Sequence, residues 1–153
     1  MRIVDYFGLD ESERARVRRR LGESEWRAGA FLKRQLEAGT FHRRYGAGSR
    51  LLLGMEGESL AAFCTLAGKD DVENTPLTPW IGFVYTYPEY RGERRSGRLI
   101  ERACALARAD GFERVYLSSN EVGLYEKYGF TYLTRMKDAW GEDTGVYCRR
   151  LEA

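Results

Sequence analysis

Apolar residues recur at helical spacing in two parts of the chain. The segment from residue 10 to residue 39 predicts two helices broken near Gly22, the second with Ser24 as its N-cap and Gly39 as its stop. A longer helix is predicted from Ser96 to Gly111, because one face collects Leu99, Ile100, Ala103, Leu106 and Ala107.

Short β-prone runs lie around these helices. They predict strands at 1–6, two within 49–68 joined by a turn at 54–57, one at 80–87, one at 114–119 and a closing hairpin of 130–140 with 144–153. A short helix is predicted at 121–129. The long helix must cross between the strands at 80–87 and 114–119, which makes that pair parallel. The order predicts an α/β (α+β) fold with a mixed sheet flanked by helices.

Composition narrows the class of protein. With 153 residues, 43% hydrophobic and 31% charged, the chain fits a single globular domain over 1–153. A net charge of +2 is too small to indicate nucleic acid as a partner, although an arginine-rich helix face from Arg14 to Arg20 leaves RNA binding as a third possibility. The three cysteines are scattered along the chain and His42 is the only histidine, so we expect no metal site. The odd number and the scatter of the cysteines also favour a reducing compartment. With no leader-like segment and no membrane-length apolar run, we expect a cytoplasmic protein that does not contact a membrane.

Four arginines lie within eight residues where the strand at 80–87 leads into the long helix. A helix N-terminus carries unpaired N–H groups and about half a positive charge, so this loop favours a phosphate or pyrophosphate ligand. The alternative is that these arginines bind no ligand and are simply the solvent-exposed, basic first turn of a helix.

Two segments together resemble a known family. "VYTYPEYRGERRSGRLI" and, after one helix and one strand, "GLYEKYGF" are similar to the acetyl-CoA-binding core of the GCN5-related N-acetyltransferases (GNAT), over roughly Trp80 to Phe130. The resemblance implies the GNAT-like acyl-CoA N-acyltransferase fold, whose sheet is splayed at its centre. It also implies acetyl-CoA as acyl donor, with no metal.

The resemblance implies a cofactor site around the arginine-rich loop. The backbone of the strand would pair with pantetheine, and the loop amides and nearby arginines would hold pyrophosphate, at positions Phe83, Val84, Tyr85, Arg91, Gly92, Glu93, Arg94, Arg95, Ser96 and Gly97. Arg94 and Ser96 stand where the family's loop commonly has small residues. The Arg94 side chain must therefore point away from the phosphate or reach round to it.

Further candidates lie near the ends of strands. Ser118 and Asn120 close the strand at 114–119, where they could hold pantetheine or the acceptor, although Asn120 could instead cap the helix that follows. Trp26, Trp80 and Trp140 are candidates for core or pocket wall, with Trp80 favoured for the acceptor site.

The resemblance assigns Tyr125 as the group that assists departure of the CoA thiolate. An amine acceptor must also lose a proton before it attacks, and the candidate general bases are Asp70, Asp71, Glu73 and Glu89, with a water relay as an alternative. The expected reaction is acetyl transfer from acetyl-CoA to a primary amine of a small molecule or peptide, by direct attack in a ternary complex. The alternative function is an acyl-CoA-binding or regulatory module of the same fold, and a homodimer is compatible with either.

Overall fold

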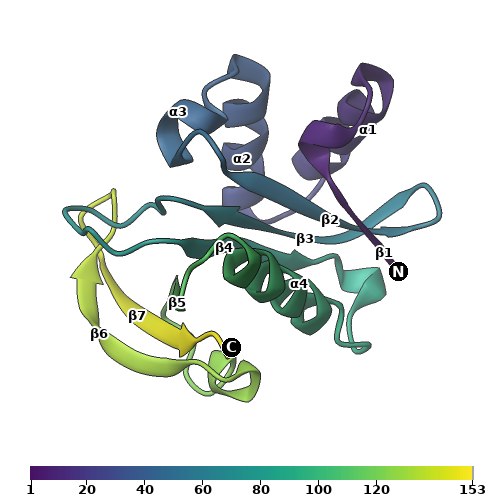
Figure 1. Cartoon of the computed structure of the whole chain (residues 1–153). Coiled ribbons are helices and arrows are strands. Elements are labelled where there is room, and N and C mark those ends of the chain that lie inside the picture. Colours follow the sequence, from purple (N-terminus) through teal and green to yellow (C-terminus); the bar gives the residue numbers. More distant parts are fainter. Residues whose placement is uncertain (153) are drawn as a thin grey trace.

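The computed structural model describes residues 1–152, which form one seven-stranded mixed sheet in the order β1-β2-β3-β4-β5-β7-β6 (Figure 1). Every neighbouring pair is antiparallel except β4 and β5, which are parallel as predicted. The strands are β1 Arg2–Asp5, β2 Arg50–Glu56, β3 Ser59–Ala67, β4 Trp80–Thr86, β5 Arg114–Ser119, β6 Thr131–Lys137 and β7 Asp143–Arg150.

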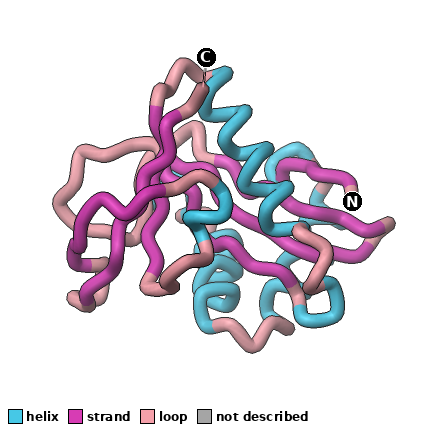
Figure 2. Tube along the Cα trace, turned by 90° about the horizontal axis from the view of Figure 1, so that it is seen from below, coloured by secondary structure: helices cyan, strands magenta, loops and turns pink. Residues whose placement is uncertain are grey.

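Helices cover both faces of the sheet. The first face carries α1 Glu11–Gly22, α2 Arg27–Ala38 and α3 Phe41–Tyr45, and the opposite face carries α4 Arg95–Ala109 (Figure 1). In the view from below, the long helix α4 lies across the strands (Figure 2). Three short 3-10 turns, Tyr6–Gly8, Pro88–Tyr90 and Tyr125–Tyr128, complete the described elements.

Helix α4 confirms its predicted apolar face, since Leu99, Ile100, Ala103 and Ala107 are all buried in one cluster with strands β2 to β5. A second cluster fills the space under α1 to α3. Each fully buried leucine or isoleucine contributes roughly 1.5–3 kcal/mol relative to exposure. The two clusters therefore hold the helices on the sheet from both sides.

Some predicted boundaries are wrong. Helix α2 begins at Arg27 with Trp26 as its N-cap, because the Ser24 hydroxyl donates to the carbonyl oxygen of Leu21 at the end of α1 instead (3.0 Å). The helix predicted at 121–129 is only the turn Tyr125–Tyr128, and the short α3 was not predicted.

The sheet opens in its middle, as the resemblance implies. Strands β4 and β5 pair only at Trp80 with Tyr116 and at Ile81 with Leu117, and then separate. On the other side of β4, Phe63 pairs with Tyr85 and Thr65 with Gly82, so that two residues of β4, Phe83 and Val84, face one of β3. This is a β-bulge, and Phe83 has a φ of 49° within it. The bulge turns β4 away from β5 and creates the space in which the candidate site lies.

Candidate functional site

A groove of about 810 Å³ lies where β4 and β5 separate. One side is formed by β4 and the loop that leads into α4, and the other by the end of β5 and the turn Tyr125–Tyr128. Of the predicted site residues, those that line it are Phe83, Val84, Tyr85, Arg91, Gly92, Arg94, Arg95, Ser96, Ser118 and Tyr125. Glu93, Gly97 and Asn120 do not line it.

The loop before α4 lines this groove and leads into the N-terminus of the helix. Arg94 is the N-cap of α4 and has the left-handed conformation, with φ 59° and ψ 30°, and its side chain does not cap the helix. Gly92 also has a positive φ, 93°. The loop thus adopts two left-handed positions even though one of them carries an arginine, and the first amides of α4 lack a side-chain partner that would compete with an anion.

The arginines of this loop have different surroundings. The buried Arg95 guanidinium donates to Glu56 (2.6 Å) and to the carbonyl oxygen of Tyr90 (2.6 Å), which ties the loop to the β2–β3 hairpin. Arg91 donates to the carbonyl oxygen of Thr86 (2.9 Å). Arg94, by contrast, is exposed at the mouth of the groove. Arg95 can therefore offer a ligand its backbone amide, whereas Arg94 can also offer its guanidinium.

A second cavity, of about 690 Å³, adjoins the groove on the side of α2. Trp26, Gly82, Phe83 and Ser118 line both spaces, so the two meet at the bulge of β4 and the end of β5. A ligand lying along the groove would bring its end to this junction. The second cavity therefore opens onto the groove at this junction.

Asp70 lines the second cavity near the junction. Its Oδ2 accepts a hydrogen bond from the Ser118 hydroxyl (3.0 Å), and its Oδ1 lies against the backbone of Gly82. Burial, together with the negative charge of Asp71, raises the pKa of Asp70 to about 7, although the hydrogen bond from Ser118 acts in the opposite direction. The carboxyl group can therefore accept or release a proton near neutral pH.

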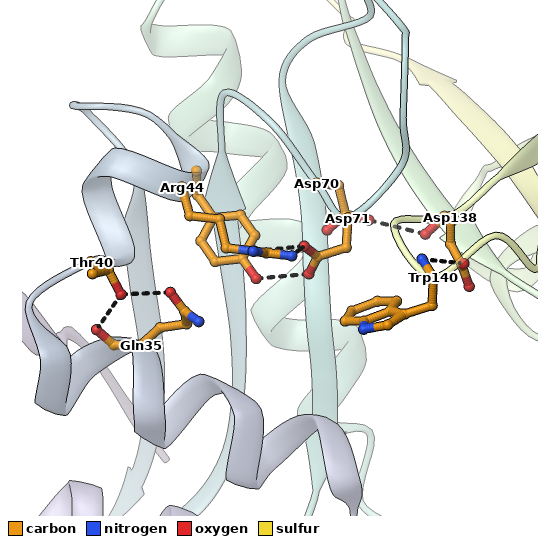
Figure 3. Close-up of polar contacts among 9 residues, drawn as sticks. Gln35, Thr40, Arg44, Asp70, Asp71, Asp138 and Trp140 are labelled. Atoms are coloured by element: carbon orange, nitrogen blue, oxygen red, sulfur yellow. Dashed lines mark hydrogen bonds and ion pairs between the residues drawn. The ribbon is translucent and has the colours of Figure 1, made fainter.

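Asp71 lies beside Asp70 but is held differently (Figure 3). Its Oδ1 accepts two hydrogen bonds from the Arg44 guanidinium (2.9 and 2.7 Å), and its Oδ2 accepts one from the Tyr45 hydroxyl (2.7 Å). Its backbone carbonyl accepts from the amide of Ala139 (3.0 Å), which joins this loop to the β6–β7 turn. Asp71 therefore serves as a fixed, paired charge next to Asp70.

The other two candidate bases lie elsewhere. The exposed Glu73 lines none of the cavities described for residues 1–152. Glu89 lines a separate cavity against α1, where it pairs with Arg20. A hydrogen bond from its own backbone N–H and the contact with Arg20 lower the pKa of Glu89 below its ordinary value. Both positions disfavour these carboxylates as bases for a reaction at the junction.

Two further expectations need correction. Asn120 does not cap a helix: its side-chain amide donates to the carbonyl oxygen of Asp143 (3.1 Å) and its oxygen accepts from the amide of Gly145 (3.3 Å), which ties β5 to β7. Trp80 is 1% exposed, and its indole donates to the carbonyl oxygen of Leu77 (2.7 Å), so it is a core residue. Trp26 and Trp140 instead line the second cavity.

Tyr125 faces the groove from its 3-10 turn, with its ring edge-on to Phe130 (6.4 Å between ring centres). Burial raises the pKa of Tyr125 to about 12, so the phenol stays protonated at neutral pH and can donate a hydrogen bond. The neighbouring Tyr128 packs on Gly97 at the start of α4, where a Cβ would lie 2.7 Å from the ring.

Within residues 1–152, the histidine, cysteine, aspartate and glutamate side chains form no group of three or more suited to a metal ion, and no helix is long and apolar enough to cross a membrane. The sequence pattern also missed two parts of the site. Gly82 gave no signal by itself, and the aromatic wall of the second cavity is assembled from distant segments.

The sequence matches the model of the Acetyltransferase (GNAT) family over residues 20–130. The chain belongs to this family. Its reaction class is accordingly acetyl transfer from an acyl-CoA, and the opened sheet with its arginine-rich loop lies within the matched region. A search among curated proteins finds no match.

Solved structures share this GNAT fold. A putative acetyltransferase of the GNAT family from Desulfovibrio desulfuricans has 16% identity and a TM-score of 0.72, covering 99% of each chain. An acetyltransferase from Streptococcus agalactiae has 22% identity and a TM-score of 0.67, covering 98% of each chain. An aminoglycoside 6'-N-acetyltransferase complexed with coenzyme A has 11% identity and a TM-score of 0.68, covering 100% of this chain and 98% of its own.

Proposed function

We propose that this protein transfers the acetyl group of acetyl-CoA to a primary amine, by direct attack of the amine in a ternary complex. The observation that carries the proposal is Asp70, a carboxyl group with a pKa of about 7 beside the junction of two adjoining cavities. The groove would hold acetyl-CoA and the second cavity the amine.

In this proposal the groove binds the donor through backbone groups. The amides of residues 92–97 and the Arg94 guanidinium hold the pyrophosphate, and the exposed backbone of Phe83, Val84 and Tyr85 aligns the pantetheine arm. Support comes from similar folds that contain the ligand, such as the aminoglycoside 6'-N-acetyltransferase complexed with coenzyme A. The thioester then lies near the bulge, beside the second cavity.

Asp70 acts as the general base. An alkyl ammonium has a pKa near 10.4, so only about one molecule in 2,500 is neutral at pH 7, and its proton must leave before attack. Asp70 accepts this first proton and passes it to solvent, and the neutral nitrogen then forms a bond to the acetyl carbonyl carbon. Asp70 accepts the second N–H proton from that nitrogen as the amide forms. The carbon–sulfur bond then breaks, the electron pair leaves on the CoA sulfur, and the products are the acetamide and CoA.

Tyr125 assists the leaving sulfur by hydrogen bonding. Its pKa of about 12 lies above the value near 8.5 of an ordinary thiol, so full proton transfer to the thiolate would be uphill by roughly 5 kcal/mol. A hydrogen bond that strengthens as charge develops on sulfur has no such cost. The phenol is therefore a donor to the transition state, and the thiolate takes its proton from solvent.

Two further proposals concern the setting of this activity. The three cysteines, Cys64, Cys104 and Cys148, are free thiols, and the first two are buried. Free thiols fit a reducing compartment, so we place the protein in the cytoplasm. We also propose that residues 1–153 work as one domain, because the candidate site combines residues from α2 to β7.

The first test is a thermal-unfolding scan with acetyl-CoA, using ATP as the control for unspecific polyphosphate binding. At ~100 Kd a ligand stabilises by about 2.7 kcal/mol, which raises Tm by several degrees for a domain of this size. The Asp70→Asn variant should keep that shift and lose about 10²-fold or more in kcat with an amine acceptor. An absent acetyl-CoA shift would overturn the proposal, and undiminished turnover by Asp70→Asn would remove Asp70 from it.

A further inference from the structure

The wall of the second cavity is rich in aromatic side chains. They come from three parts of the chain: Trp26 and Phe31 from the start of α2, Phe83 from the bulge of β4, and Trp140 from the β6–β7 turn. The rings of Phe31 and Trp140 meet edge to face, with 5.6 Å between their centres. A ligand with a flat apolar surface can pack against such rings and shield them from water.

Trp140 is the most exposed of these rings, with 61% of its surface accessible. Its position is fixed by the turn that carries it, because Asp138 accepts a hydrogen bond from the amide of Trp140 (2.9 Å; Figure 3). Asp138 also accepts one from the amide of Glu142 (2.9 Å). The indole is thus presented to the cavity with most of its apolar surface uncovered. A ligand that covers it would gain hydrophobic free energy without first reorganising the turn.

The ionisable side chains around the second cavity have one more negative charge than positive charges. Four carboxylates line it, those of Asp70, Asp71, Asp138 and Glu142. Three arginines offset part of this charge: Arg44 pairs with Asp71, and Arg27 and Arg34 line the cavity without an ion pair to these carboxylates within residues 1–152. When Asp70 is ionised, this balance suits a ligand with a single positive charge, and it gives the further ammonium groups of a polyamine or aminoglycoside no matching excess of carboxylates.

From this wall and this charge balance we infer that the acceptor is a monoamine whose primary amino group is carried by an aromatic body. This inference rests on the proposed function. The amino group lies at Asp70, next to the thioester, and the body lies between the rings of Trp26, Phe31 and Trp140. Phe83 contributes from the floor, at the point where the cavity meets the groove.

The test compares four amines. Binding to the CoA-saturated protein is measured by calorimetry for phenethylamine, tryptamine, spermidine and kanamycin, and kcat/KM is measured with acetyl-CoA. We expect the two aromatic monoamines to bind at least 10-fold more tightly than the other two and to have the higher kcat/KM. Ethylamine serves as an acceptor that has the amino group and lacks the body.

A pair of variants tests the role of the wall. Trp140→Ala should lower kcat/KM for phenethylamine about 10-fold, mainly through KM, and leave ethylamine unchanged. Tyr132→Ala is the matched control, because Tyr132 is 54% exposed near the start of β6, the strand that leads into the same turn, and does not line the cavity. This variant should leave kcat/KM unchanged for both phenethylamine and ethylamine.

The outcomes separate this inference from the proposed function. Tighter binding of spermidine or kanamycin than of the aromatic amines overturns the inference, as does an equal loss for ethylamine and phenethylamine in Trp140→Ala. Tight binding of phenethylamine without acetylation of any amine supports the inference about the cavity and overturns the proposed function. Acetylation of ethylamine with no preference for an aromatic body leaves the proposed function standing and overturns the inference.

Discussion

The Asp70 carboxylate packs directly against the backbone of Gly82. A Cβ built at position 82 would lie 2.6 Å from Oδ1 of Asp70 and 3.1 Å from the hydroxyl of Thr65. The strand that opens the sheet therefore has a glycine where the candidate base approaches it. Any side chain at this position must move the carboxylate away from the junction.

We expect Gly82→Ala to lower kcat/KM by at least ~10-fold, because a small misplacement of a base is costly, and to destabilise the fold by about 1–3 kcal/mol through overpacking. Steady-state kinetics and thermal unfolding measure the two effects. Gly48→Ala is the matched control, since Gly48 has open space around it. Full activity of Gly82→Ala would show that Asp70 has no fixed role there.

The pKa of Asp70 should shift in opposite directions in two variants. The Ser118 hydroxyl lowers this pKa and the Asp71 charge raises it. Ser118→Ala should therefore move the break near pH 7 in the profile of kcat/KM to higher pH, and Asp71→Asn should move it to lower pH. The profile is measured with an amine of pKa above 9, so that its own ionisation lies outside this range. Shifts in the same direction, or none, would assign the break to another group.

The same group makes stability depend on pH. The folded pKa of Asp70, about 7, lies above its ordinary value of 3.8, so the unfolded chain releases this proton first as pH rises. The folded state thus loses stability between about pH 4 and pH 7, and Asp70→Asn removes that loss. Thermal scans should show a gain in Tm for Asp70→Asn at pH 8 that becomes small at pH 4. A gain that does not depend on pH would contradict a raised pKa.

Tyr125→Phe separates hydrogen bonding to sulfur from packing. The ring remains and the hydroxyl is lost, so we expect kcat to fall by about 10²-fold, with little change in acetyl-CoA affinity or in Tm. Pre-steady-state measurement of the acetyl-transfer step checks this directly. Tyr132→Phe is the control, because Tyr132 lines neither the groove nor the second cavity. An unchanged chemical step would remove Tyr125 from the mechanism.

Local patterns in the sequence predicted most elements of the fold. The apolar face of α4 is recognised from apolar residues three or four positions apart, and the strands from residues two positions apart. Both spacings can be read directly from a single sequence. The boundary at Ser24 was wrong because its hydroxyl has two possible uses, as an N-cap or as a donor to the preceding helix, and the packing of α1 against α2 selects the second.

The candidate site was predicted only in part, because its contacts are not local. Asp70 was one of four candidate carboxylates, and what distinguishes it is burial beside Ser118 and Gly82, which lie 48 and 12 residues further along the chain. The aromatic wall joins α2 to the β6–β7 turn, more than a hundred residues away. Sequence periodicity does not reveal contacts between such distant segments. The motif pointed to the residues around the groove, whereas the second cavity became visible only in the folded structure.

Substitutions of Arg94 can distinguish the contribution of the loop's backbone conformation from the contribution of the arginine's charge. Its φ of 59° is a left-handed conformation that costs a non-glycine residue roughly 1–2 kcal/mol, and its exposed guanidinium lies at the mouth of the groove. Arg94→Gly removes strain and charge together, whereas Arg94→Ala removes the charge and keeps the strain. We expect Arg94→Gly to be more stable than Arg94→Ala by about 1 kcal/mol, because the relief exceeds the added entropy of glycine in the unfolded chain.

For acetyl-CoA affinity, we expect no difference between the two variants. Because the guanidinium is proposed to hold the pyrophosphate, both variants lose a charge-assisted contact, and Kd rises by about 10-fold in each. If the side chain points away, both keep the affinity of the unaltered chain, and the loop binds through its amides alone. Thermal unfolding and acetyl-CoA titration of the two variants decide between these uses of Arg94, and a loss of affinity in Arg94→Ala alone would instead trace the defect to the strained backbone.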